Sequence, residues 1–498
     1  MTLPDTISTG NAGLDIILKG GLSPRRLYLL EGAPGSGKTT LALQFLREGV
    51  RRGEKALYIT LSETAEELAA VAASHGWDSG EFDVFEFDSA AEIFGEGRDQ
   101  SILHPWEMEL GETIRLIQEE VERVKPKRVV FDSLSEMRLL AQDPLRYRRQ
   151  VLALKQFFSG RDTTVILVDD MTGKADGRDA HLHSLCHGVI TLERLTLDFG
   201  AARRRLQVQK LRGIDFTAGY HDFTIRTGGL QIYPRLIAAT HHGEFADEVT
   251  PSGVQGLDNL LDGGPLRGTS TLLTGPAGSG KTTIALQYLH AACERGEPST
   301  VYEFDERIGT LMARAKAFGF DLEKHIANGT LFVEQIDPAE ISPGEFAFRV
   351  RREVEERKAR MIVIDSLNGY VAAMPQEQHL ILQMHELLSY LSQKGVVTLL
   401  IDPQTGLVGA MTTSLNISYI ADAVVLLRFF EAEGRVRKAV SVLKNRGGAH
   451  EDTIRELRVD AGGIRVGEPL SQFRGILTGT PEYLGKRDPL MEDRDRER

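Results

Sequence analysis

The sequence predicts an α/β fold built twice over, in two domains that each hold a largely parallel β-sheet flanked by helices. Three observations support this prediction. The chain has 498 residues, and because a single hydrophobic core rarely grows beyond about 250–300 residues, it has room for two large domains. Most of the sequence occurs twice at a nearly constant spacing. Within each copy, short apolar runs alternate with amphipathic stretches, as strands and covering helices do in parallel sheets.

The internal repeat has a period of 243 residues in its first part. Residues 9–15 (TGNAGLD) return as residues 252–258 (SGVQGLD), and residues 32–40 (GAPGSGKTT) return as residues 275–283 (GPAGSGKTT). Later pairs, VVFDSL with VIDSL and KLRG with KNRG, lie 233 and 234 residues apart. The copies therefore differ by one insertion, and a unit of this length is the size of a complete domain.

The domain bounds follow from this repeat. We expect a first domain at 1–240 and a second at 241–485, joined within residues 234–249, followed by a charged tail at 486–498. Each copy is expected to fold by itself.

The first copy offers clear candidates for secondary structure. Apolar runs rich in β-branched and aromatic residues predict strands at 26–30, 56–60, 128–131 and 165–168. An amphipathic stretch at 112–124 predicts a helix between two of them.

Composition argues against several classes of protein. Hydrophobic residues make up 41% and charged residues 26% of the chain, which is ordinary for a globular protein. No run approaches the roughly 18 apolar residues of a membrane span, and the first residues lack the basic and apolar regions of a signal peptide. We therefore expect a cytoplasmic protein. The net charge of −12 argues against a protein that coats nucleic acid.

Each copy carries the complete phosphate-binding pattern G-x-x-x-x-G-K-[ST], directly after an apolar strand and before a helical run. The glycines let successive backbone N–H groups surround an anion at the start of a helix. The lysine is expected to meet the β- and γ-phosphates of a nucleotide, and the next threonine to offer a hydroxyl to Mg²⁺. The predicted residues are Gly32, Gly35, Ser36, Gly37, Lys38, Thr39 and Thr40, and in the second copy Gly275, Gly278, Ser279, Gly280, Lys281, Thr282 and Thr283.

An aspartate is expected to complete each Mg²⁺ site. Asp132 and Asp365 end hydrophobic strands 94 and 84 residues after the two lysines. A carboxylate at that place can hold magnesium through water, so Thr39 with Asp132 and Thr282 with Asp365 are the predicted metal residues.

Hydrolysis also needs a group that orients the attacking water. In RecA-like proteins a carboxylate at the end of the neighbouring strand does this, and the candidates here are Glu63, Asp305 and Glu306. The second copy has two adjacent carboxylates, whereas the first has Ser62 beside Glu63. The alternative is a carboxylate that only complements a helix dipole.

The K-x-R-G motifs close a late strand in each copy. If the strands follow the RecA order, these cations cannot easily reach their own P-loop, but they can reach a nucleotide held by a neighbouring subunit. Lys210, Leu211 and Arg212, and likewise Lys444 and Arg446, are therefore predicted to contact ATP across an interface. The alternative is a solvated strand end.

These motifs together resemble the KaiC family, the ATPases and autokinases of the cyanobacterial clock, and their wider bacterial relatives. The likeness covers nearly the whole chain and also rests on residues 8–15 (STGNAGLD) and 473–481 (FRGILTGTP). It implies two tandem RecA-like P-loop NTPase domains in a homohexamer of stacked rings, with ATP and Mg²⁺ between subunits. It also implies ATPase activity, with Ser/Thr autokinase and autophosphatase activity in the second domain. By the same likeness Phe318 packs near the base, and Ser74 lies within one residue of the equivalent first-domain position.

The chain departs from this family in two places that matter for function. The clock kinases phosphorylate an adjacent Ser-Thr pair, whereas here Ser418 is followed by Tyr419, so Ser418 is the candidate phosphosite and a two-site cycle is not expected. The short tail after Pro481 argues against a KaiA-like partner, which leaves a KaiB-like regulator as the expected partner.

Two other functions remain open at this stage. A RecA- or RadA-like DNA-dependent ATPase would need basic, glycine-rich loops, and residues 171–179 (MTGKADGRD) are only weakly of that kind. A scaffold held together by ATP with little turnover would not need the intact lysine, threonine, aspartate and glutamate set that both copies retain.

Overall fold

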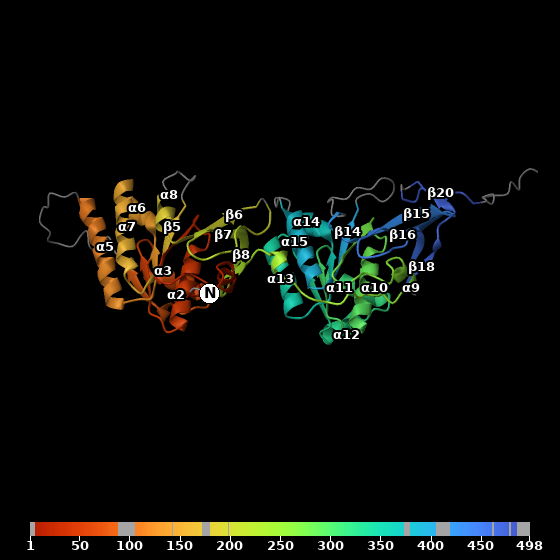
Figure 1. Ribbon diagram of the computed structural model, residues 1–498, viewed down its shortest axis with the longest axis horizontal. Coiled ribbons are helices and arrows are strands. Elements are labelled where there is room, and N and C mark those ends of the chain that lie inside the picture. Colours follow the sequence, from red (N-terminus) through yellow and green to blue (C-terminus); the bar gives the residue numbers. More distant parts are fainter. Residues whose placement is uncertain are drawn as a thin grey trace, which may run out of the picture. The chain divides into compact units, whose positions relative to one another are not determined.

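The computed structural model describes residues 5–87, 105–141, 143–171, 180–197, 199–372, 379–404, 419–460, 463–477 and 480–485 (Figure 1). Its contacts divide the chain into two units, Met1–Arg235 and Leu236–Arg498. The division lies close to the join that the repeat predicts, and we keep 1–240 and 241–485 as the proposed domain bounds. Nothing in the described parts of the chain is a helix both long and apolar enough to cross a membrane.

The first unit is built around one sheet in the order β3-β2-β4-β5-β1-β6-β7-β8-β9. The strands from β3 to β6 run parallel, and β7, β8 and β9 are added antiparallel. The four strands predicted from the sequence are confirmed as β1, β2, β4 and β5. The bounds are β1 Leu27–Gly32, β2 Ala56–Thr60, β3 Asp83–Glu86, β4 Arg128–Asp132, β5 Thr164–Asp170, β6 Gly188–Leu195, β7 Arg203–Leu211, β8 Tyr220–Arg226 and β9 Gly229–Tyr233.

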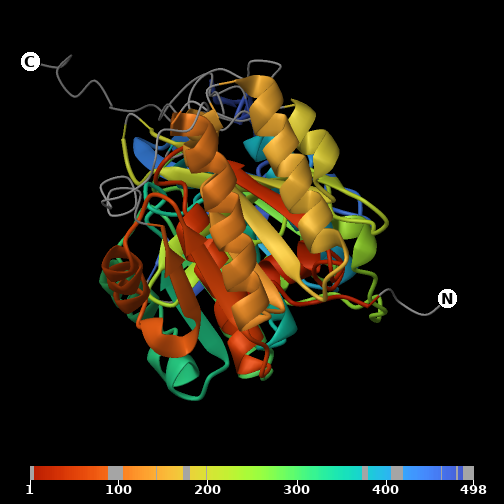
Figure 2. The same cartoon turned by 90° about the vertical axis from the view of Figure 1, so that its left-hand side faces the viewer.

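Helices cover both faces of this sheet, so its central strands are buried throughout. One core cluster packs α1, α2 and α3 against the sheet, and another packs α5, α6 and α7 against the opposite face. Figure 2 shows the long helices of this second layer lying across the sheet. The helix predicted at 112–124 is confirmed as the end of α5. The helices are α1 Ala12–Ile17, α2 Lys38–Arg51, α3 Ala65–Ser74, α5 Pro105–Val124, α6 Leu134–Ala141, α7 Pro144–Ser159 and α8 Ala180–Leu185, with a 3₁₀ turn η1 at Ser79–Glu81.

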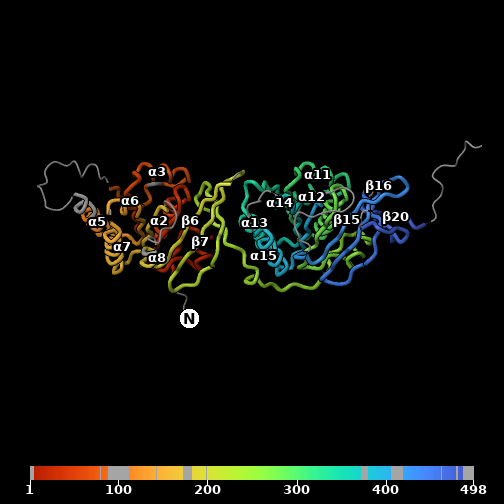
Figure 3. Tube along the Cα trace, turned by 90° about the horizontal axis from the view of Figure 1, so that it is seen from above, coloured from red at the N-terminus to blue at the C-terminus, as the bar shows by residue number. Residues whose placement is uncertain are grey.

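The second unit repeats this topology strand for strand, in the order β12-β11-β13-β14-β10-β15-β16-β17-β18. The antiparallel pair β15–β16 corresponds to β6–β7, and Figure 3 shows each pair side by side within its own unit. The bounds are β10 Ser270–Gly275, β11 Ser299–Glu303, β12 Leu331–Gln335, β13 Met361–Asp365, β14 Val397–Pro403, β15 Ala423–Ala432, β16 Arg435–Asn445, β17 Arg455–Asp460 and β18 Gly463–Pro469, with a short hairpin of β19 Phe473–Arg474 and β20 Glu482–Tyr483.

Two helical layers again enclose the sheet of the second unit. One cluster joins α9, α10, α11 and α12 to the sheet, and the other joins α13, α14 and α15 to its opposite face. The bounds are α9 Gln255–Asn259, α10 Lys281–Glu294, α11 Ile308–Ala317, α12 Leu322–Ala327, α13 Pro343–Glu355, α14 Leu367–Ala372 and α15 Leu380–Gln393, preceded by a 3₁₀ turn η2 at Ala238–Thr240.

The motif at residues 8–15 closes the first loop of the unit onto the core. The Asp15 carboxylate accepts hydrogen bonds from the Ser8 hydroxyl at 2.6 Å and from the Thr9 hydroxyl at 2.7 Å and backbone N–H at 2.8 Å. Gly13 lies so close to β9 that a Cβ atom there would come within 2.2 Å of the Ile232 carbonyl oxygen. This sequence signature therefore has a structural role.

A fully buried arginine ties that loop to the sheet. The Arg128 guanidinium, at the start of β4, pairs with Glu54 at 2.6 Å and donates to the carbonyl oxygens of Ser8 at 2.8 Å and Phe45 at 2.9 Å. Its side chain passes over Gly49, where an added Cβ would lie 2.5 Å from the Arg128 Cδ.

The matching positions of the second unit are filled differently. Met361 starts β13 where Arg128 starts β4, and Ala292 stands at the position of Gly49. Met361 is buried in an apolar cluster that also contains Ala292. The arginine and glycine thus form one matched pair, and the methionine and alanine another.

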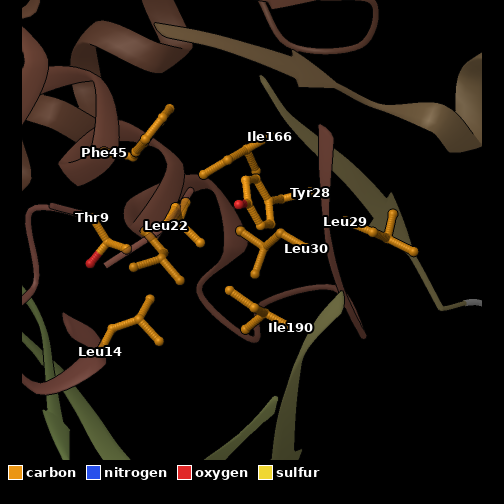
Figure 4. A pocket seen from close by; sticks show the side chains of 10 residues that line it. Thr9, Leu14, Leu22, Tyr28, Leu29, Leu30, Phe45, Ile166 and Ile190 are labelled. Atoms are coloured by element: carbon orange, nitrogen blue, oxygen red, sulfur yellow. The ribbon is translucent and has the colours of Figure 1, made fainter. Parts of the chain in front are cut away.

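Figure 4 shows a small cavity between β1 and α2 of the first unit. Apart from Thr9, its lining side chains are apolar or aromatic, among them Leu14, Tyr28 and Phe45. It offers no polar groups that would orient a ligand, so we interpret it as a packing gap in the core.

We predict that Arg128→Met lowers the free energy of unfolding of the first unit by about 2–4 kcal/mol, because it removes the hydrogen bonds to the Ser8 and Phe45 carbonyl oxygens and the ion pair with Glu54. Adding Gly49→Ala should recover part of the loss by filling the vacated space. Urea denaturation followed by tryptophan fluorescence measures this, since Trp77 and Trp106, the two tryptophans, both belong to the first unit.

The control is Lys127→Met, which changes the exposed neighbour and should alter stability by less than about 0.5 kcal/mol. Equal effects of the two substitutions would show that the buried hydrogen bonds do not stabilise the unit.

Candidate nucleotide-binding sites

A glycine-rich loop connects a buried strand to a helix in each unit, β1 to α2 and β10 to α10. The N-cap residues Gly37 and Gly280 have φ angles of 107° and 112°, a left-handed conformation that favours glycine. Because these N-caps carry no side chain, the first N–H groups of both helices receive no side-chain cap. Such a helix start favours a bound anion.

The lysine of each loop folds back over the loop itself. The Lys38 ammonium donates to the carbonyl oxygens of Gly32 at 2.9 Å and Ala33 at 3.0 Å. Lys281 donates to the corresponding oxygens of Gly275 and Pro276, both at 2.8 Å. Both ammonium groups are therefore held at the place where the loop encloses an anion.

The two lysines differ in their charged partners. Lys38 also pairs with Asp170 at 2.7 Å, at the end of β5 opposite Gly32. Pro403 occupies the matching place opposite Gly275, so the second site lacks that carboxylate. Burial lowers the pKa of Lys281 to about 8, although the carboxylates of Asp365 and Asp402 favour its charged form.

The strand-end aspartate meets the P-loop threonine directly in the second unit, where the Thr282 hydroxyl donates to Asp365 at 2.7 Å. In the first unit Asp132 instead accepts from the Tyr58 hydroxyl at 2.5 Å, and Thr39 lies against that hydroxyl. The structure thus brings each predicted metal pair into one place.

These residues fit a bound Mg²⁺ ion. Burial raises the pKa of Asp365 to about 6 and also raises that of Asp132, which means that both carboxyl groups lack enough positive charge around them. Carboxylate and hydroxyl oxygens, with water, are the ligands that Mg²⁺ prefers. A divalent cation would supply the missing charge.

The predicted water-orienting carboxylates follow β11 in the second unit. The Glu306 carboxylate is held by Arg314 of α11 at 2.5 Å, and Asp305 accepts a hydrogen bond from the hydroxyl of Ser366, directly after Asp365. Asp305, Glu306 and Asp365 line one cleft with Lys281 and Thr282.

The structure adds a third carboxylate that the sequence analysis did not select. Glu303, the last residue of β11, is 1% exposed and accepts from the backbone N–H groups of Glu306 at 2.9 Å and Asp305 at 3.3 Å. Burial, with the nearby Asp365 carboxylate, raises the pKa of Glu303 to about 8. The sequence offered one signal for Glu303, because the repeat aligns this acid with the neutral Thr60 of the first copy.

In the first unit a neutral side chain closes the corresponding loop. The Thr60 hydroxyl accepts from the Glu63 N–H at 2.9 Å and donates to the Glu63 carbonyl oxygen at 2.7 Å. Burial raises the pKa of the Glu63 carboxyl, with further contributions from Asp132 and Asp170. Glu63, the carboxylate that the sequence predicts to orient water, therefore lies near Asp132. It has no second acid directly before it, unlike the pair in the other unit.

The residues proposed to face the base lie at the ends of α3 and α11. Phe318 lines the same cleft as Lys281 and Glu306. Ser74 is exposed, and its hydroxyl donates to the Val71 carbonyl oxygen at 2.7 Å.

The K-x-R-G motifs lie at the opposite edge of the sheet from the P-loops. Leu211 pairs with Gly188, which pairs with Tyr28, four residues before Gly32. Four residues of strand span about 13 Å, which is beyond the reach of Arg212. In the second unit Asn445 pairs with Ala423, which pairs with Thr271, four residues before Gly275.

The cations of these motifs are anchored by backbone oxygens. Lys210 donates to the carbonyl oxygens of Cys186, at 2.9 Å, and of His183, and the exposed Arg212 donates to that of Ser184 at 2.9 Å. In the second unit Lys444 donates to the Ala421 carbonyl oxygen at 2.5 Å. Arg446 is exposed.

Arg212 also borders a hollow on the first unit. Other basic residues lining this hollow are Arg25, Arg26, Lys155 and His187. The positive charges of the arginines and the lysine suit an anionic group presented from outside the unit.

The candidate phosphosite Ser418 lies outside the described residues. Its neighbour Tyr419 is described, with 53% of its surface exposed.

Comparison with known proteins gives a consistent result along the whole chain. The family model described as "ATPase: KaiC" matches residues 7–237 and again residues 250–471. The chain is 28% identical over 490 residues to the circadian clock protein KaiC3 of Synechocystis sp., covering 97% of this chain and 95% of that protein. It is 27% identical to the circadian clock oscillator protein KaiC of Acaryochloris marina, with 98% and 93% covered, and to that of Parathermosynechococcus lividus, with 96% and 88% covered.

We predict that nucleotide affinity at the second site falls about fivefold between pH 8 and pH 9. Lys281 has a pKa of about 8 in the empty site, whereas bound phosphates favour its charged form, so binding above that pH must take up a proton. Isothermal titration calorimetry in buffers of different ionisation enthalpy measures both effects, with Lys38→Met present to remove binding at the first site.

The outcome that contradicts this prediction is a constant affinity with a heat of binding that does not depend on the buffer.

Proposed function

Because the chain belongs to the KaiC ATPase family, we propose that it is a hexameric, ring-forming ATPase whose second unit also acts as a Ser/Thr autokinase. One observation carries this proposal. The lysine and threonine of the P-loop, the strand-end aspartate and the pair of acids after β11 line a single cleft. These are the parts that phosphoryl transfer from ATP requires.

The second site binds and orients the nucleotide through residues already in place. Lys281 exchanges its carbonyl contacts for the β- and γ-phosphates, and Thr282 and Asp365 would hold Mg²⁺, which would supply positive charge against the phosphates. Glu306 accepts the proton of the attacking water, so that ATP and water give ADP and phosphate.

Autophosphorylation would use the same acids with a different nucleophile. The hydroxyl of Ser418 attacks the γ-phosphorus, its proton passes to Glu306, and ADP leaves. Asp305 is held by Ser366 and Glu306 by Arg314, so both carboxylates have a defined position. A positioned base of this kind typically contributes about 10²–10⁴ in rate.

The first site supports hydrolysis with a reduced set of groups. Glu63 stands alone there, Asp132 is engaged by Tyr58, and Lys38 is paired with Asp170. A bound nucleotide must displace that carboxylate from Lys38. We therefore propose slower turnover in the first unit than in the second.

The K-x-R-G motifs support the proposed ring. Arg212 and Arg446 lie too far from their own P-loops to act there, and the basic hollow around Arg212 can receive the phosphates of a neighbouring subunit. An arginine supplied in trans stabilises the transferring phosphoryl group.

Signalling or timing in the cytoplasm is the proposed context, since the relatives compared above are named as circadian clock proteins. A KaiB-like regulator is the proposed partner. A DNA-dependent ATPase and an ATP-held scaffold are weaker alternatives, because the net charge of −12 disfavours the first and the complete acid set disfavours the second.

We predict that Glu306→Gln removes both activities of the second unit, with hydrolysis there falling at least about 100-fold because the proton acceptor is lost. Incubation with Mg²⁺ and γ-labelled ATP, following free phosphate and label on the protein, measures this. Ser418→Ala should abolish the label while phosphate release continues, and Glu63→Gln should leave the label in place. Phosphate release from the unmodified protein without any label would restrict the function to an ATPase.

We also predict that inactive subunits complement one another. Glu306→Gln chains lack the acid and Arg446→Ala chains lack the arginine, so rings of either alone should be inactive in the second layer. In mixed rings, an Arg446→Ala subunit keeps its own acid and receives the arginine of its Glu306→Gln neighbour. Kinase activity that returns after dissociation and mixing supports the arginine in trans, whereas its failure to return would place each arginine in its own site.

A further inference from the structure

A cluster of two histidines and a glutamate lies at the end of α10 away from the P-loop. His290 and Glu294 are four residues apart and so share one face of α10, and His325 faces them from α12. A ring nitrogen of each histidine and a carboxylate oxygen lie within 4.8 Å of one another. His290 follows Lys281 by nine residues, which is about 14 Å along the helix.

The buried histidine of this cluster offers a free nitrogen to it. His325 is 1% exposed. Its Nδ1 lies 3.4 Å from the Thr330 hydroxyl, and that hydroxyl donates its own proton to Asn328 Oδ1 at 2.6 Å. The hydroxyl oxygen can then only accept from Nδ1, so Nε2 is the nitrogen that faces the cluster.

Nε2 of His325 meets an oxygen rather than a hydrogen-bond donor. It lies 3.0 Å from Glu294 Oε1, yet it makes no hydrogen bond within the described structure. Two electron-rich atoms at this distance require a positive charge between them, either a proton or a metal ion. Poor hydrogen-bond geometry and the second imidazole nearby favour the metal ion.

The other histidine is also suited to be a ligand. A metal binds the neutral form of the His290 ring. Its Nδ1 is buried without a hydrogen-bond partner in the described residues, and the ring stacks on Phe320 with centroids 5.1 Å apart. Packing therefore holds the ring in a defined orientation.

Two further charged groups face the cluster. Lys324 donates to Glu294 Oε1 at 2.9 Å, and Asp321 lies near His290. The Lys324 side chain is 55% exposed, so it can move into water when a cation takes its place.

The first unit has nothing comparable at the matching positions. Arg47 and Arg51 replace His290 and Glu294 on α2, and the short turn η1 stands where the second unit has α12, which carries His325. Arg47 pairs with Glu81 at 2.8 Å and lies over the ring of Trp77. The cluster is therefore specific to the second unit and is not required by the shared fold.

We propose that His290, Glu294 and His325 bind one zinc ion that fastens α12 to α10. Two imidazole nitrogens and one carboxylate are a ligand set typical of zinc, and three protein ligands leave a fourth position for water. The hydrogen bond from His325 Nδ1 to Thr330 is the kind of outer contact that orients a ligating histidine.

Zinc titration of the metal-free, full-length chain tests this proposal, in the absence of nucleotide and Mg²⁺ and with a competing chromophoric chelator. We expect one equivalent bound per chain. Glu294→Gln and His290→Gln, at partly exposed positions, should each weaken zinc binding by at least about 100-fold, beyond the range seen for outer-shell changes. The controls Glu323→Gln and His385→Gln change an exposed acid on α12 and an exposed histidine on α15, and should bind zinc as the unmodified chain does.

Two further measurements make the outcome clear. Cobalt(II) in place of zinc should give the visible absorption of a tetrahedral site, and this absorption should be lost in Glu294→Gln. Zinc should also raise the melting temperature of the unmodified chain but not of that variant. Absence of a saturable site, or equal binding by the ligand variants and the controls, would overturn the proposal.

Discussion

The parallel register of the central strands is the constraint on which both nucleotide sites depend. In the first unit β1 pairs with β5 so that Gly32 stands opposite Asp170, and β2 pairs with β4 so that Thr60 stands opposite Asp132. The strands are buried on both faces and apolar along most of their length, so polar side chains gather at their carboxyl ends. A glycine loop at that edge then brings a helix start and a lysine to the same place.

The two copies use this common frame with different electrostatics. In the first site Tyr58 donates a hydrogen bond to Asp132, and Asp170 pairs with Lys38. In the second site Thr282 donates a hydrogen bond to Asp365. Glu303 then adds a buried acid to the second site. Both sites hold acids with raised pKa values, and the second also holds a lysine whose pKa burial lowers. Such a site has more to gain from binding a metal and phosphates.

The antiparallel extension of each sheet has a consequence for assembly. By reversing direction after β6 and after β15, the chain carries each K-x-R-G motif to the edge opposite its own P-loop. A single unit therefore cannot combine both groups on one nucleotide, and the proposed ring removes this separation by placing neighbouring subunits edge to edge. The proposed zinc cluster is separate from the nucleotide site, because α10 carries His290 and Glu294 away from the P-loop.

The sequence by itself determined the repeat, the α/β class, the P-loops and the acids at strand ends, because each depends on a short motif and its local periodicity. Tertiary structure decided what could not be read locally. Asp170 pairs with Lys38 from 132 residues away, and His325 meets His290 from a separate helix. Glu303 could not be distinguished from its acidic neighbours until the register of β11 placed it beside Asp365. The physical reason is that charge, burial and distance depend on which segments pack together, and only the folded chain settles that.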